Sequence, residues 1–74
     1  NPTTKIKFDI PKASFVKLSV FDMLGRKIEQ LVNTNLTPGS YEVTYSIKNA
    51  NSGIYFYRIE TSDFSETKKM IIVK

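Results

Sequence analysis

Apolar and polar residues alternate one by one along several short stretches of this sequence. The alternation is complete in TKIKFDI (residues 4–10) and in SYEVTYSI (residues 40–47). Successive side chains of a β-strand point to opposite faces of the sheet, so this pattern is typical of a strand with one buried face. The pattern restricts the chain to a predominantly β fold.

Two further runs are predicted strands with a stronger apolar character. Residues 14–22 (SFVKLSVFD) have Val16, Leu18 and Val20 on one face. Residues 54–60 (IYFYRIE) begin with apolar residues on both faces, which is typical of a central strand buried on both sides.

Residues 26–33 (RKIEQLVN) form a predicted strand with an irregular pattern. Ile28, Leu31 and Val32 fit neither strict alternation nor a long helix. A β-bulge, which places one extra residue in a strand, explains this spacing, and a short helical turn is the alternative. The last predicted strand covers residues 65–74 (SETKKMIIVK).

Turn residues separate the predicted strands. In DMLGR, Asp22 is suited to accept backbone hydrogen bonds and Gly25 to adopt a positive φ, which predicts a tight hairpin turn. NTNLTPGS (residues 33–40) is a predicted loop with Pro38-Gly39 as the central pair of a type II turn. KNANSG (residues 48–53) is a predicted polar turn. We expect structural roles in turns and core for Asp22, Gly25, Pro38, Gly39, Gly53 and Tyr55.

The number and spacing of these elements predict the fold class. Six short strands, with turn signals about every 8–12 residues and no convincing helix, indicate an all-β sandwich or a small barrel. The 74 residues are expected to form one domain. The pattern does not give the order of the strands.

The charge pattern argues against a nucleic-acid-binding protein. The net charge is +4, and most lysines alternate with apolar residues, as expected for solvated strand faces. A nucleic-acid groove needs clustered basic residues beside exposed aromatic rings, whereas Arg26 and Arg58 are the only arginines. No apolar stretch approaches the roughly 20 residues of a membrane-spanning helix, so no membrane insertion is expected.

The composition also predicts that the chain is not an enzyme. It has no histidine and no cysteine, which removes Ser-His-Asp and Cys-His catalysis and the commonest zinc ligands. The carboxylates fall about one per strand or turn, as solubilising residues do. A structural calcium remains an open alternative, although NTN and KNANSG offer amides without acids. No cofactor is expected.

The tyrosines allow two interpretations. Tyr41, Tyr45, Tyr55 and Tyr57 are suited to form a platform on which sugars stack. Tyrosines at alternate strand positions are more often core residues whose hydroxyls reach the rim, and we favour that interpretation.

Several motifs in order resemble a known family. They are NPTTKIKFDIP, LSVFDMLGRK, QLVN, LTPGSYEVTY, SGIYFYRIE and the final ETKKMIIVK. Together they resemble the type A C-terminal sorting domain of the type IX (Por) secretion system of Bacteroidetes-type bacteria, over nearly the whole chain. No single motif is specific; their order carries the resemblance.

The resemblance implies a fold and a function. The fold is a small immunoglobulin-like antiparallel β-sandwich of about six to seven strands, without catalytic activity. The chain would be a C-terminal sorting domain, as a fragment of a larger secreted protein. It would carry an attached N-terminal cargo through the periplasm to the type IX translocon. A cell-surface sortase would then leave the cargo on the cell surface or in the medium.

The resemblance also directs attention to the end of the sequence. An apolar strand that pairs into a sheet would display its end reproducibly, and its edge is available to a partner strand. The alternative is a last strand whose lysines only guard an edge against aggregation. The residues expected to be recognised by the translocon are Lys68, Lys69, Met70, Ile71, Ile72, Val73 and Lys74.

Two other functions stay open beside the sorting role. One is an immunoglobulin-like or fibronectin-type structural spacer in a multidomain extracellular protein. The other is a carbohydrate-binding accessory module, which requires exposed coplanar aromatic rings.

Overall fold

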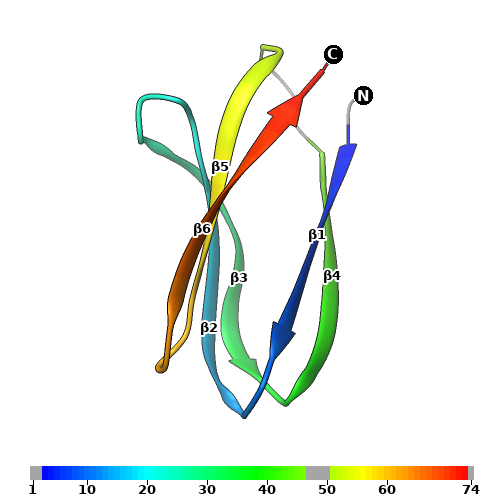
Figure 1. The fold of residues 1–74 in the computed structure, drawn as a ribbon, viewed down its shortest axis with the longest axis vertical. Helices are drawn as coiled ribbons and strands as arrows, with labels where there is room; N and C mark the ends of the chain where they lie inside the picture. The colour runs from blue at the N-terminus through cyan, green and yellow to red at the C-terminus, as the bar shows by residue number, and fades with distance from the viewer. Residues whose placement is uncertain (1–2, 47–50, 74) are drawn as a thin grey trace.

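A computed structural model describes residues 3–46 and 51–73 of the chain. Within these ranges the chain forms six β-strands and no helix (Figure 1). The strands are β1 (Thr3–Ile10), β2 (Ser14–Phe21), β3 (Lys27–Leu36), β4 (Gly39–Ser46), β5 (Gly53–Glu60) and β6 (Ser65–Ile72). The described residues include no helix long and apolar enough to cross a membrane.

The strands form two antiparallel sheets that face each other. One sheet has the order β3-β2-β5-β6, and the other contains β1 and β4. Figure 1 shows the two-stranded sheet beside the four-stranded one, with the end of β6 and the start of β1 at the same end of the molecule. The predicted all-β class and antiparallel sandwich are confirmed, and the two separate sheets exclude the barrel alternative for the described residues.

The core lies between the two sheets and follows the alternation of the sequence. Ile6 and Ile10 on β1 face Val16, Leu18 and Val20 on β2, and all five are buried. Burying each such side chain contributes about 1.5–3 kcal/mol through the hydrophobic effect. The remaining core residues are Tyr45, Tyr55, Ile59 and Ile72.

The predicted bulge is present where β2 pairs with β3. Leu18 is opposite Val32 and Ser19 is opposite Gln30, so Leu31 is the extra residue. A second shift lies between Val20 and Phe21. The irregular apolar spacing of this segment therefore arises from a bulged strand, and the alternative of a short helical turn is wrong.

The predicted loop at residues 33–40 is largely wrong. β3 continues to Leu36, where it pairs with Ser14, and β4 starts at Gly39. Polar side chains on this edge strand point to solvent, so they do not prevent the backbone from pairing with β2. Gly39 has a φ of 153°, instead of the roughly +80° of the third residue in a type II turn, so the predicted type II turn is also wrong.

The tyrosines do not form a sugar platform. Tyr45 and Tyr55 are buried, and Tyr41 and Tyr57 are half-buried and pack against the same core. The Tyr55 hydroxyl donates a hydrogen bond of 2.7 Å to the carbonyl oxygen of Asn51. The predicted core role of the tyrosines is confirmed.

Candidate functional site

β6 is the edge strand of the four-stranded sheet and carries most of the residues predicted for recognition. It pairs with β5 along its whole length, and no described strand pairs with its other side. One row of its backbone N–H and C=O groups therefore faces outward, as a partner strand requires. Lys74 lies outside the described residues.

The structure does not bring the predicted recognition residues together on one surface. Ile72 is buried with 4% of its surface exposed, and Met70 is half-buried against the core. Ile71 and Val73 are 67% and 74% exposed. The alternation of a strand explains the split, because neighbouring side chains point to opposite faces. Ile72 and Met70 thus anchor the segment, and Ile71 and Val73 are accessible to a partner.

Lys68 and Lys69 also lie on opposite faces of β6. Lys68 is paired with Tyr57 in the register of the sheet, and its Nζ lies 3.5 Å from Oε1 of Glu66. Lys69 is paired with Phe56 and forms no ion pair with the described residues. The charge of Lys69 is the less compensated of the two.

A second exposed apolar group lies at the same end of the molecule as Ile71 and Val73. Met23 and Leu24, in the turn between β2 and β3, are 62% and 79% exposed. Figure 1 shows this turn and the end of β6 at one end of the sandwich. Accessible apolar side chains from two separate segments are therefore displayed there.

The turn that carries Met23 and Leu24 is held by Asp22. Its Oδ1 accepts hydrogen bonds of 2.9 Å from the backbone N–H groups of Leu24 and Arg26, and its Oδ2 accepts one of 2.8 Å from Arg26 Nε. The N–H of Gly25 donates to the carbonyl of Asp22 at 3.0 Å, and Gly25 has a φ of 86°. The predicted hairpin turn, with Asp22 first and Gly25 fourth, is confirmed.

These hydrogen bonds also set the charge state of the Asp22 carboxylate. They lower the pKa of Asp22 from its ordinary value of 3.8, and the bond from the Arg26 backbone is the largest cause. The carboxylate of Asp22 therefore stays charged to lower pH than that of an ordinary aspartate. The other predicted turn residues lie elsewhere in the fold. Gly53 lines a shallow hollow together with Asp22. Pro38 lies between β3 and β4, and Gly39 is the first residue of β4.

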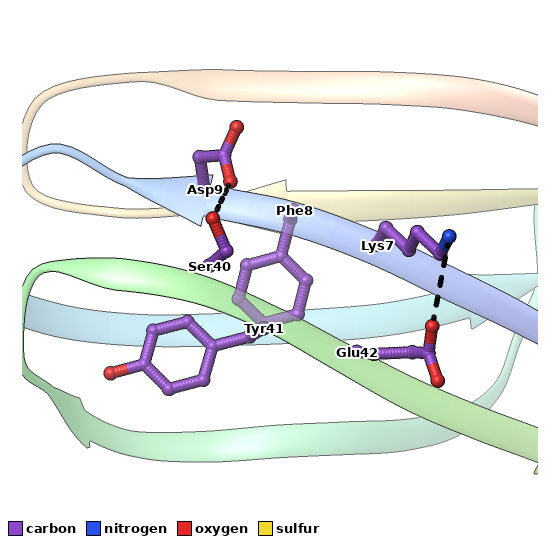
Figure 2. A pocket seen from close by; sticks show the side chains of 6 residues that line it. All are labelled: Lys7, Phe8, Asp9, Ser40, Tyr41 and Glu42. Atoms are coloured by element: carbon purple, nitrogen blue, oxygen red, sulfur yellow. Dashed lines mark hydrogen bonds and ion pairs between the residues drawn. The ribbon is translucent and has the colours of Figure 1, made fainter.

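A hollow of about 410 Å³ lies on the two-stranded sheet (Figure 2). The Phe8 and Tyr41 rings stack there, with centroids 5.5 Å apart and an interplanar angle of 17°. The charged groups beside them are satisfied within the sheet. Lys7 Nζ lies 3.8 Å from Glu42 Oε2, and the Ser40 hydroxyl donates a 2.7 Å hydrogen bond to Asp9.

No candidate metal centre is assembled in the described residues. No three His, Cys, Asp or Glu side chains gather there at a spacing that would hold a metal ion. The described surface has an open strand edge and exposed apolar side chains.

The neighbours of Lys69 on the outer sheet face were not predictable from the sequence. Phe56 and Arg58 on β5 lie on the same outer sheet face as Lys69, and Phe21 on β2 lies beyond Phe56. Alternation within each run assigns these residues to one side of their own strand. Alternation does not indicate that β2, β5 and β6 are neighbours. No single strand pattern could therefore predict that Phe21, Phe56, Arg58 and Lys69 lie close together.

Comparisons with known proteins give one positive finding. The family model described as the secretion system C-terminal sorting domain matches residues 1–73, which is nearly the whole chain. No curated protein and no solved structure gives a match.

Proposed function

Because this chain belongs to the family of secretion system C-terminal sorting domains, we propose that it directs an attached cargo across the outer membrane through the type IX machinery. The cargo precedes this chain, passes through the periplasm and reaches the cell surface or the medium. The translocon recognises the domain, and a cell-surface sortase acts on the cargo that it carries. The family match over residues 1–73 is the observation that carries the proposal.

We assign recognition to the exposed half of the last segment. Ile71 and Val73 offer accessible apolar surface, and Lys69 offers an uncompensated charge beside them. The free edge of β6 adds backbone groups with which a partner strand can pair. Met70 and Ile72 support this display from the core side, because their burial fixes where the strand lies.

A secretion assay tests both parts of the proposal. The chain is fused to the C-terminus of a fluorescent protein that carries a periplasmic export signal, in a bacterium with a type IX system. The variant Ile71→Ser/Val73→Ser removes the exposed apolar groups of the last segment. The matched control Met23→Ser/Leu24→Ser removes two similarly exposed apolar groups from the turn at the same end.

We expect the unaltered fusion and the turn variant to reach the surface or medium, and the Ile71→Ser/Val73→Ser variant to stay in the periplasm. If the unaltered fusion folds but stays in the periplasm, the sorting role is wrong. If all three fusions are exported equally, the sorting role stands and the assignment to Ile71 and Val73 is wrong.

A further inference from the structure

The basic residues of the described chain divide into two groups. Lys5, Lys7, Lys12, Arg26 and Lys68 each lie within 4.0 Å of a carboxylate oxygen. The others form no ion pair within the described residues. This second group consists of Lys17, Lys27, Arg58 and Lys69.

The register of the four-stranded sheet places this second group on one face. Lys17 alternates with the buried Val16 and Leu18, so it points away from the core. Arg58 is paired with Ser19, two residues further along the same face. Lys69 is paired with Phe56, which alternates with the buried Tyr55 and therefore also faces outward.

One row of side chains crosses this outer face from edge to edge. Lys27 on β3 is opposite Phe21 on β2, Phe21 is opposite Phe56 on β5, and Phe56 is opposite Lys69 on β6. Two half-buried phenyl rings are thus flanked by two lysines. A hollow of about 280 Å³ adjoins the row and is lined by both rings, with Gly25, Arg58 and Thr67.

The charge of this face is nearly all of one sign. Glu60 also lies on this face, where it is paired with Lys17. Arg58 lies between Glu60 and the phenyl ring of Phe56 along β5. The register places no other carboxylate on this face among the described residues. Clustered cations around apolar surface attract an anionic partner and orient it. Burial of the two phenyl rings against an apolar group of the partner contributes binding energy.

The dimensions of the row indicate the shape of the partner. Neighbouring strands lie about 4.8 Å apart, so a row across four strands spans roughly 14 Å. An extended peptide advances about 3.4 Å per residue, so side chains at positions i and i+4 on one face are separated by roughly the same distance. Carboxylates at i and i+4 match the two lysines, with an apolar residue at i+2 above the rings.

We propose that the outer face around Lys27, Phe21, Phe56 and Lys69 binds an extended acidic polypeptide segment in which two carboxylates flank an apolar residue. A protein partner fits better than a nucleic acid, because the two rings are half-buried and leave less aromatic surface than a groove on which successive bases stack. The proposal concerns what this face binds and does not rest on the sorting role.

The test uses the full chain and short synthetic peptides. The probe has the core Glu-Ser-Leu-Ser-Glu, and a control peptide has Gln in place of both Glu residues. The variant Lys17→Gln/Lys27→Gln/Lys69→Gln removes three charges from the outer face. The matched control Lys5→Gln/Lys7→Gln/Lys12→Gln lowers the net charge equally but leaves this face intact. Circular dichroism and melting curves establish that both variants fold.

We expect the acidic peptide to bind the unaltered chain and the matched control variant alike. Loss of the two exposed ion pairs from Lys27 and Lys69, together with the charge of Lys17, weakens binding by roughly tenfold. In amide NMR spectra, the peptide shifts signals of Phe21, Phe56, Arg58 and Lys69, and added salt weakens binding.

Three outcomes overturn the proposal. The first is equal weakening in both triple variants, which means that net charge alone attracts the peptide. The second is equal binding of the Gln peptide, which removes the role of the carboxylates. The third is a single-stranded oligonucleotide that binds this face more tightly than the acidic peptide, which makes the partner a nucleic acid.

Discussion

Lys68 and Lys69 are adjacent in the sequence but lie on opposite faces of β6. Lys68 is paired with Tyr57 and has its Nζ 3.5 Å from Glu66, whereas Lys69 is paired with Phe56 on the outer face. The two positive charges therefore have different surroundings, although the sequence presents them as one basic pair.

This separation predicts different effects of neutralising each lysine on export of the cargo fusion. Lys69→Gln removes a charge that no described carboxylate compensates, so we expect export to fall by about two- to fivefold, the scale of one exposed ion pair. Lys68→Gln removes a charge already beside Glu66, so export should change little. Equal losses in the two variants would show that the lysines act as one unit.

The Asp22 turn predicts a pH dependence of stability. Because hydrogen bonds lower the pKa of Asp22 in the folded chain, folding favours its charged form. This stabilisation is fully present above the ordinary pKa of 3.8 and is lost as the pH falls through the lower folded value. Asp22→Asn keeps an acceptor oxygen but no titrating charge, so part of the acid dependence should disappear.

Urea unfolding at neutral and acidic pH measures this effect. The control is Asp63→Asn, which removes a carboxylate that lies 3.4 Å from Lys12 and holds no turn. The explanation fails if the free energy of unfolding of Asp22→Asn follows pH as steeply as that of the unaltered chain.

Gly25 should resist replacement for a backbone reason. Its φ of 86° lies in the left-handed region, and a Cβ placed there meets no atom within 4 Å. Gly25→Ala should therefore cost about 1 kcal/mol from backbone strain alone, which lowers Tm by roughly 4–8 °C. Gly25→Asn should lose less, because Asn adopts this conformation more readily. A Tm for Gly25→Ala equal to that of the unaltered chain would contradict this account.

The hydroxyl of Tyr55 should contribute measurably to stability. It donates a hydrogen bond of 2.7 Å to the Asn51 carbonyl, so Tyr55→Phe leaves that acceptor without its donor and should cost about 1 kcal/mol. Tyr57→Phe is the matched control, because the Tyr57 hydroxyl has no hydrogen bond within the described residues. Chemical denaturation of the two variants compares them directly, and equal losses would refute the role of this bond.

The strands were predictable wherever one face of a segment is buried. Residues 4–10 were predicted and β1 covers Thr3–Ile10, because burial of alternate side chains imposes a period of two on the sequence. The hairpin turn at Asp22 was predictable for another local reason, since Asp and Gly at fixed positions satisfy its hydrogen bonds. In both cases the physical cause lies within a few neighbouring residues.

The parts that escaped prediction depend on distant partners. The second half of β3, up to Leu36, is polar and is a strand because β2 offers backbone groups to it. The row from Lys27 to Lys69 exists because β2, β5 and β6 lie side by side. Alternation orients each side chain on its own strand, but it carries no information on which strands are neighbours.

The pairing of β1 with β4 has a consequence for the speed of folding. Thr3 pairs with Ser46, so the first strand finds its partner only after most of the chain has been made and has come back on itself. Chains dominated by such distant contacts fold in milliseconds to seconds, whereas local helical bundles fold in microseconds to milliseconds. During that interval the polypeptide stays unfolded, in a form that a channel admitting only unfolded chains can still take up.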